Sequence, residues 1–285
     1  MNVIIRPALA SDLHACAHIN YEAFKGISEQ HNFPTDFPTL EFAIEAASLL
    51  LNNPAFYSLV AETDGQVVGC SFMDERNPIR GIGPVSVDPR FQGRGIGRRL
   101  MAGLLARGQD AIGWRLLNEL FNLSALSLYV SLGFEVKEPL VLVNGKPRSH
   151  PVAGVEVRPL VSEDIEECRV LCQQVYGCDR TRELLDALDS FSPFVACKQG
   201  RIVAYASDVS FLGYGVAQTV EDMQALLLGF AAFTMQPLSF HVAMRQAELF
   251  RWCLQEGLRT LKPLTVMAIG EYQQPQGCYF PSFLY

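Results

Sequence analysis

Hydrophobic and polar positions change their period repeatedly along the first half of the chain, which predicts short strands alternating with amphipathic helices. Alternation of apolar and polar residues favours a strand, whereas apolar residues spaced three and four apart favour a helix. Asp64-Gly65 lies between two apolar runs and is a hairpin signal. The order of elements predicts a mixed α/β fold. Strands are expected at 3–6, 56–62, 66–74, 82–87, 114–121 and 135–143, and helices at about 11–24, 39–51, 95–107 and 124–132.

The second half of the chain repeats patterns of the first half. VIIRPALASD at 3–12 resembles VEVRPLVSED at 155–164, and VAETDGQVVG at 60–69 resembles VACKQGRIVA at 195–204. A third match pairs YVSLGFEVKEPL at 129–140 with CLQEGLRTLKPL at 253–264. Because the matches keep their order while their spacing shrinks, we predict two copies of one domain, the second shorter. The prolines and glycines of 144–154 predict a linker between domains at 1–145 and 154–285.

The overall composition favours a protein with a packed core and disfavours several partner classes. Of 285 residues, 49% are hydrophobic and 19% charged, with a net charge of -7. A nucleic-acid-binding chain is usually basic, so that class is disfavoured. No apolar run approaches the roughly 20 residues that a membrane helix needs, so we expect a soluble, cytoplasmic protein without membrane contact. The eight cysteines form no CxxC pair, and no metal site is expected.

A local basic segment contrasts with the acidic chain. Six arginines and one acidic residue lie between positions 76 and 99. Within it, a predicted strand ends at Asp88-Pro89, and Gln92-Gly93-Arg94-Gly95-Ile96-Gly97 opens an amphipathic helix. The first amides of a helix have no partners within the helix and lie at its partly positive end, so they bind phosphate readily. Glycines let the phosphate approach the backbone. The segment therefore predicts a site for a small anionic ligand.

The chain resembles the GNAT superfamily of acyl-CoA-dependent N-acetyltransferases over roughly residues 3–143. The family motif Q/R-x-x-G-x-G/A is matched by Gln92, Gly95 and Gly97. A further landmark, an asparagine seven residues before a tyrosine and followed by Gly-Phe, is matched in NLSALSLYVSLGF at 122–134. The resemblance implies an α+β fold in each copy, with a mixed, mostly antiparallel sheet flanked by helices.

The resemblance also implies which residues hold acetyl-CoA, with no metal. In the family the strand before the motif separates from its neighbour, and the pantetheine arm of the cofactor pairs with the exposed main chain. The backbone of the glycine-rich turn holds the pyrophosphate, with the arginines adding positive charge. The expected cofactor-binding residues are Val85, Val87, Gln92, Gly93, Arg94, Gly95, Ile96, Gly97, Arg98 and Asn122.

The implied reaction is direct attack of an amine on the acetyl thioester. The resemblance assigns Tyr129 as the donor of a proton to the leaving thiolate, with packing on a helix face as the alternative. Asp74 and Glu75 are candidate bases at the end of a hairpin strand, and an ion pair with Arg76 is the alternative. His31, Phe33 and Phe37 lie in the loop 30–38, which in the family shapes the acceptor pocket; His31 is a further base candidate. The Tyr285 carboxylate is a rarer candidate for the base.

The second copy has lost the cofactor motif. Its corresponding region, 209–232, has no Q/R-x-x-G-x-G before the helix, and Cys253 stands at the position of Tyr129. We therefore expect a degenerate domain that does not bind the cofactor. The predicted function is an N-acetyltransferase acting on a primary amine of a small molecule or protein. The alternative is a non-catalytic acyl-CoA-binding regulator. The acceptor, the acyl chain length and a homodimer stay open.

Overall fold

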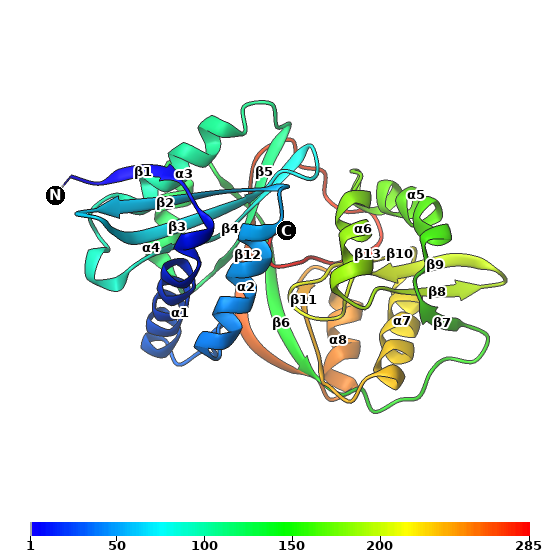
Figure 1. Cartoon of the computed structure of the whole chain (residues 1–285). Coiled ribbons are helices and arrows are strands. Elements are labelled where there is room, and N and C mark those ends of the chain that lie inside the picture. The colour runs from blue at the N-terminus through cyan, green and yellow to red at the C-terminus, as the bar shows by residue number, and fades with distance from the viewer. Residues whose placement is uncertain (1) are drawn as a thin grey trace. The chain divides into compact units, whose positions relative to one another are not determined.

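The computed structural model describes residues 2–285 and divides the chain into two compact units that are not contiguous in sequence (Figure 1). The first unit contains Met1–Glu135 and Ala268–Glu271, and the second contains Val136–Met267 and Tyr272–Tyr285. Each unit thus includes chain from both predicted copies. The boundaries 1–145 and 154–285 for two separately acting domains stay a prediction.

The first unit is a mostly antiparallel sheet flanked by helices. Strands β1 to β4 pair antiparallel in sequence order, β5 pairs parallel with β4, and the end of β12 lies beside β5, where the Glu271 amide donates to the Ile112 carbonyl (2.9 Å). Its elements are β1 (Ile4–Pro7), the 3-10 turn η1 (Ala10–Asp12), α1 (Leu13–Gln30), α2 (Leu40–Asn52), β2 (Phe56–Thr63), β3 (Gln66–Asp74), β4 (Ile79–Val87), the 3-10 turn η2 (Pro89–Phe91), α3 (Ile96–Arg107), β5 (Gly113–Glu119) and α4 (Leu123–Ser131), with the end of β12 (Arg259–Gly270).

Helices cover both faces of this sheet. Successive residues of a strand point to opposite faces. On β3, the Cys70 thiol contacts the Cys16 carbonyl of α1, whereas a Cβ at Gly69 would lie 3.3 Å from Ile96 and 3.2 Å from Leu100 of α3. The helices α1 and α3 therefore lie on opposite faces. This cover on both sides explains why β3 is buried from Val68 to Asp74.

Strand β4 loses one of its two neighbours halfway along. The parallel register joins only Ile79–Gly81 with Gly113–Arg115, so β3 is the only strand partner of residues 82–87 within the described chain. The β3–β4 register also shifts by one residue between Ser71 and Met73, a bulge opposite Gly83-Pro84. A bulge re-aims a strand. The two parallel strands therefore share only their first residues, and β4 keeps an unpaired edge further on.

The predicted elements of the first copy are confirmed in type and order, with differences at their ends. The hairpin turn at Asp64-Gly65 has positive φ at both residues, as a tight two-residue turn requires. The first helix runs six residues past the predicted end at Phe24, to Gln30, where Ser28 is still buried. The fifth strand ends at Glu119 rather than at 121, because the chain turns there into α4.

The second unit repeats the arrangement of strands and helices. Strands β7 to β10 pair antiparallel in sequence order, as β1 to β4 do, and β13 adds to β10. Strand β6 pairs with β11 in the same unit. The elements are β6 (Glu135–Gly145), β7 (Glu156–Pro159), the 3-10 turn η3 (Ser162–Asp164), α5 (Ile165–Tyr176), α6 (Thr181–Ser190), β8 (Phe194–Lys198), β9 (Arg201–Ala206), β10 (Gly215–Ala217), α7 (Val220–Phe233), β11 (Leu238–Ala243), α8 (Ala247–Gln255), most of β12, and β13 (Cys278–Phe280).

The repeat extends to individual hydrogen bonds. Arg6 binds both carboxylate oxygens of Asp12 at 2.7 and 3.0 Å, and Arg158 binds Asp164 in the same way at 2.6 and 2.8 Å. Each carboxylate also caps a 3-10 turn, by accepting from the amide three residues before it. These bonds lower the pKa of both carboxyl groups against the opposing effect of burial. The structure thus confirms the mixed, mostly antiparallel α+β fold and its duplication.

The segment that follows β6 is held by one carboxylate. Glu256 accepts hydrogen bonds from the amides of Arg148 and Ser149, both 2.8 Å, and from the Ser149 hydroxyl at 2.7 Å. Burial acts to raise the pKa of Glu256, but these donors together lower it. The predicted linker 144–154 is therefore bound by Glu256, just before Gly257, and is not solvated along its whole length.

Candidate functional site

The glycine-rich turn leads directly from β4 into α3. Gly93 and Gly95 have φ of +72° and +78°, and Gly95 is the N-cap of α3. A side chain at either position would be strained, because L-residues rarely adopt this conformation. A Cβ at either position would have no atom within 4 Å, so open space lies over the turn. The turn thus presents bare backbone to that space.

The amides that open α3 are available to a ligand. The first bond of the helix runs from the Arg99 amide to the Gly95 carbonyl (3.2 Å). The amides of Ile96, Gly97 and Arg98 precede it and have no acceptor among residues 2–285, since no side chain caps this helix. The helix also has no acidic residue in its first turn. Uncapped amides at the positive end of a helix form a seat for an anion.

The arginines around the turn differ in their engagement. Arg90 is paired with Asp88 (2.6 Å), which lowers the pKa of that carboxyl. Arg94 donates to the Arg90 carbonyl (3.3 Å) and lies over the Phe91 ring, and Arg98 donates to the Ser131 hydroxyl (2.7 Å). Arg99 is exposed and has no ion-pair partner in the described chain. All of these charges remain at the surface beside the amides, where an anion can reach them.

The expected cofactor-binding residues of β4 lie next to the turn. Val85 and Val87 are both half-buried and point to the same face, since they are two residues apart on the strand. They lie in the part of β4 that has no partner on the β5 side. The Gln92 side chain donates to the Val87 carbonyl (3.0 Å), which connects the turn to the end of the strand. The structure therefore brings Val85, Val87 and the whole 92–98 turn together.

Asn122 has a structural task in the free protein. It is the N-cap of α4, and its side-chain oxygen accepts from the Ala125 amide (3.1 Å). This bond satisfies one of the helix's first amides. The side-chain NH2 group of Asn122 has no acceptor among residues 2–285 and is the group that remains for a ligand. A Cβ at Gly97 would lie 3.4 Å from Leu128, so α4 packs beside the start of α3.

Tyr129 lies on α4 with 8% of its surface exposed. Its ring meets the Phe134 ring edge-on at 6.0 Å. Its hydroxyl has no hydrogen-bond partner among residues 2–285, and burial raises the pKa of Tyr129 to about 12. The phenol therefore keeps its proton throughout the neutral and mildly alkaline range, as a proton donor must.

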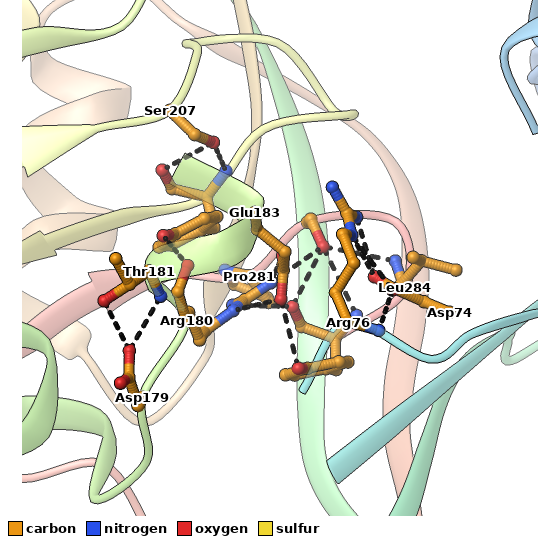
Figure 2. A network of polar contacts seen from close by, with 12 residues as sticks. Asp74, Arg76, Asp179, Arg180, Thr181, Glu183, Ser207, Pro281 and Leu284 are labelled. Atoms are coloured by element: carbon orange, nitrogen blue, oxygen red, sulfur yellow. Dashed lines mark hydrogen bonds and ion pairs between the residues drawn. The ribbon is translucent and has the colours of Figure 1, made fainter. Parts of the chain in front are cut away.

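The two carboxylates predicted as bases are both bound by arginines. Asp74 is buried, and Arg76 donates to its carboxylate through Nε at 2.9 Å and through Nη2 at 2.7 Å (Figure 2). Glu75 pairs with Arg107 (3.2 Å) on a more exposed surface. A carboxylate that is held by a guanidinium gives up that pair when it accepts a proton. Their role as bases stays a prediction, and the ion pair with Arg76 is present.

The three predicted acceptor-pocket residues separate into two places. Phe33 stacks on Phe121 at 4.5 Å, and the His31 ring lies 5.4 Å from the same ring. Phe37 is buried against Phe24 at 5.0 Å, in the core between α1 and α2. Phe121 directly precedes Asn122, so His31 and Phe33 lie at the start of α4. Phe37 pins the loop to the core instead.

Two residues of the site have no sequence signal of their own. The Phe121 ring contacts the rings of His31 and Phe33, and the Ser131 hydroxyl accepts a hydrogen bond from Arg98. Each contact joins segments far apart in the chain, and neither residue stands at one of the defining positions of the family motifs. Within residues 2–285 the structure gathers no group of three or more His, Cys, Asp or Glu side chains that could hold a metal ion. None of the helices in that range is long and apolar enough to cross a membrane.

Comparison with known sequences places this site in a described domain. Residues 54–136 match the family model described as the acetyltransferase (GNAT) domain, a range that contains the glycine-rich turn, Asn122 and Tyr129. A curated relative, an uncharacterised protein of Mycobacterium leprae, is 27% identical over 156 residues. That alignment covers 54% of this chain and 39% of the relative, so the chain matches well under half of that protein's length.

Solved structures share the fold along nearly the whole chain. A protein of Pyrococcus horikoshii described as an acetyltransferase superimposes with a TM-score of 0.77 at 18% identity, over 99% of this chain and 94% of that one. A tandem GNAT protein from the clavulanic acid biosynthesis pathway gives a TM-score of 0.62 at 13% identity, over 94% and 98%. At these identities the likeness establishes the fold alone.

Proposed function

We propose, from the match of residues 54–136 to the acetyltransferase (GNAT) domain, that the protein transfers an acetyl group from acetyl-CoA to a primary amine. The acceptor is an amine of a small molecule or of a protein. The observation that carries the proposal is the set of free amides at Ile96, Gly97 and Arg98, next to the unpaired edge of β4. A cytoplasmic location and a homodimer remain predictions.

The glycine-rich turn fits the diphosphate of coenzyme A. Three free amides point from the positive end of α3, and the space over Gly93 and Gly95 is open. Charge-assisted bonds from such amides to an anion are stronger than neutral ones. Arg94 and Arg98 add positive charge at the rim and would exchange their present neutral acceptors for phosphate oxygens.

The unpaired edge of β4 fits the pantetheine arm, whose amides can pair with a strand main chain. Residues 82–87 have one strand partner where an interior strand has two. Val85 and Val87 supply apolar surface on one face of this edge. Asn122 would add the donor that its capping bond leaves over. We assign these residues to holding the arm in an extended form.

Acetyl-CoA, when bound, supplies a thioester that an amine can attack and a thiolate that leaves. We assign Tyr129 as the donor that protonates this thiolate. Its raised pKa, about 12, keeps the hydroxyl protonated, and the absence of a partner among residues 2–285 leaves its donor capacity unused. General acid catalysis of this kind contributes about 10²–10⁴-fold to a rate.

His31 is a candidate base that is not bound by an arginine among residues 2–285. Its Nδ1 lies 3.0 Å from the Ile27 carbonyl, which can only accept, so Nδ1 carries the proton and Nε2 of the neutral ring is an acceptor. Asp74 and Glu75 would each have to leave an ion pair. We therefore expect proton removal from the amine to depend more on His31 than on Glu75.

A panel of amines tests the proposal. Purified protein is incubated with acetyl-CoA and with small cationic amines, amino acids and peptides, and release of free thiol is followed with a chromogenic disulfide. We expect at least one amine to raise thiol release well above the rate without acceptor. Hydrogen exchange should also slow at the amides of residues 93–98 when coenzyme A is added. No acceptor-dependent release, together with unchanged exchange at these amides, would refute the proposal.

Paired substitutions test the base. His31→Gln keeps a polar side chain but removes the basic nitrogen, and Glu75→Gln is its matched control. We expect His31→Gln to reduce kcat at least tenfold with the affinity for coenzyme A unchanged, and Glu75→Gln to change kcat less than threefold. The reverse order would assign the base to Glu75.

A further inference from the structure

The second unit differs from the first at the position beside the fourth strand of the repeat. Strands β7-β8-β9-β10 follow the order and antiparallel pairing of β1-β2-β3-β4, and α7 follows β10 as α3 follows β4. Beside β4 the edge is unpaired over residues 82–87. Beside β10 lies β13, with Gly215, Val216 and Ala217 opposite Phe280, Tyr279 and Cys278. The second copy therefore has a strand where the first has an open edge.

Strand β13 also contacts β11, the strand that corresponds to β5 in the repeat. The rings of Phe240 and Phe280 are 5.1 Å apart, and Nδ1 of His241 lies 3.2 Å from the Pro281 carbonyl. On the other side, a Cβ at Gly215 of β10 would overlap the Phe280 ring. The segment Cys278–Ser282, here named the resident strand, thus fills the space between β10 and β11.

Side chains of the second unit clamp the main chain of the resident strand. Gln246 donates to the Tyr279 carbonyl (2.6 Å) and accepts from the Tyr279 amide (3.1 Å), as a neighbouring strand would. The Tyr279 hydroxyl donates to Glu138, and Arg245 pairs with the same carboxylate at 2.6 Å. Gln246, Tyr279 and Glu138 are all buried, so the hydrogen bonds among them are shielded from water.

A buried arginine holds the residues that follow the resident strand. Arg180 has no exposed surface and pairs with Glu183 at 2.5 Å (Figure 2). It donates to a main-chain oxygen of Tyr285 (3.2 Å), and the ring centroids of Tyr214 and Tyr285 lie 3.8 and 4.2 Å from its guanidinium carbon. A charge buried this deeply is stable only with such partners. The contacts of Arg180 with Tyr285 therefore hold the chain at a second position, beyond Ser282.

The helix that follows β10 is closed to anions. The Thr219 hydroxyl accepts from the Asp222 amide (3.2 Å), so the start of α7 is capped from within the chain. Glu221 and Asp222 add negative charge in the first turn, and Lys198 pairs with Asp222. At the start of α3 there is neither a side-chain cap nor an acidic residue. The second unit thus has neither the free edge nor the free amides of the first.

We propose that the resident strand takes the place in the second copy that the pantetheine arm of acyl-CoA takes in the first, as a built-in ligand that closes this copy. The comparison with the first copy rests on the proposed function. A main chain paired to β10 satisfies the same strand edge that the arm would, and the clamps of Gln246 and Glu138 replace the missing diphosphate seat as its anchor. The chain consequently binds one acyl-CoA.

Hydrogen exchange on the full chain tests the proposal, with Gln246→Ala against Gln255→Ala as the matched control. Gln255 lies at the exposed end of α8 and forms no side-chain hydrogen bond to the resident strand among residues 2–285. Loss of the two Gln246 bonds should speed exchange in residues 278–282 and in Gly215–Ala217 together, by about 10–100-fold. The control should change neither segment more than threefold.

Two outcomes would overturn the proposal. Faster exchange confined to 278–282, with Gly215–Ala217 unchanged, would show a surface segment that does not complete the sheet. Protection of residues 215–222 by coenzyme A in the unaltered protein, or binding of two coenzyme A molecules per chain by calorimetry, would show an open second copy. Failure of coenzyme A to protect residues 93–98 would instead refute the proposed function, because the coupling of 278–282 to β10 is measured without ligand.

Discussion

Replacement of Tyr129 by phenylalanine separates a catalytic hydroxyl from a packing residue. The change removes one oxygen and keeps the ring, which meets Phe134 at 6.0 Å. The hydroxyl has no hydrogen-bond partner within residues 2–285, so its removal leaves no other donor or acceptor unsatisfied in the free protein. We therefore expect a free energy of unfolding within about 0.5 kcal/mol of the original value.

The expected loss of activity is far larger than the loss of stability. If Tyr129 protonates the leaving thiolate, its removal should lower kcat by about 10²–10⁴-fold, which is about 3–5 kcal/mol in the barrier. Because the pKa of Tyr129 is raised to about 12, the rate of the unaltered protein should show no decline from this group up to pH 10. Thiol release with the best amine of the panel measures both quantities.

Calorimetric titration with coenzyme A and thermal unfolding accompany this assay, with Tyr21→Phe on α1 as the control. We expect unchanged affinity and melting temperature in both variants. A kcat for Tyr129→Phe within threefold of the original would refute the assignment of the proton donor. Unchanged coenzyme A binding in a protein that acetylates no amine of the panel would favour the non-catalytic regulator.

Three further changes, the first with a control substitution, test the glycine-rich turn, the Arg158–Asp164 pair and the segment that Glu256 holds. Gly95→Val places a β-branched residue at φ +78°, so the affinity for coenzyme A measured by calorimetry should fall at least tenfold, whereas Gly97→Ala, which meets only ordinary contacts, should change it less than threefold. Asp164→Asn should lower the free energy of unfolding at pH 7 by about 1–3 kcal/mol, through the loss of charged bonds to Arg158. Because the pKa of Asp164 is lower in the folded than in the unfolded protein, Asp164 stabilises the fold above its unfolded pKa, and this stabilisation is lost as pH falls through its folded pKa. In urea unfolding, the free energies of the original protein and of Asp164→Asn should therefore converge below about pH 4. Glu256→Gln should also lower the free energy of unfolding at pH 7, since the pKa of Glu256 is lowered in the folded protein. Limited proteolysis at pH 7 should cut the segment 146–150 of this variant at least threefold faster.

Features that depend on local backbone geometry were predictable from the sequence. The turn at 92–97 was expected because glycines permit positive φ, and Gly93 and Gly95 adopt it. The Asp64-Gly65 hairpin follows from the same rule. The Arg6 and Arg158 patterns indicated a repeat, and their ion pairs are nearly identical. Each of these features is decided within a few residues of chain.

The base and the acceptor pocket could not be predicted with the same certainty. Asp74 and Glu75 are adjacent carboxylates that the sequence does not distinguish as candidate bases. Only the fold shows that Arg76 binds Asp74 and that Arg107 binds Glu75. Phe33 and Phe37 are four residues apart, yet one stacks on Phe121 and the other enters the core. Side-chain direction in an irregular loop is set by what packs against it, which periodicity does not record.

The sequence by itself determined the class of fold, the duplication and the glycine-rich turn, because these depend on hydrophobic period, on local repeats and on the freedom of glycine. The tertiary structure decided which chain completes each sheet. Strand β6 pairs with β11, the end of β12 lies beside β5, and β13 fills the space between β10 and β11. Strand edges accept any chain with free amides and carbonyls, so the choice among partners rests on long-range packing and closure of the core.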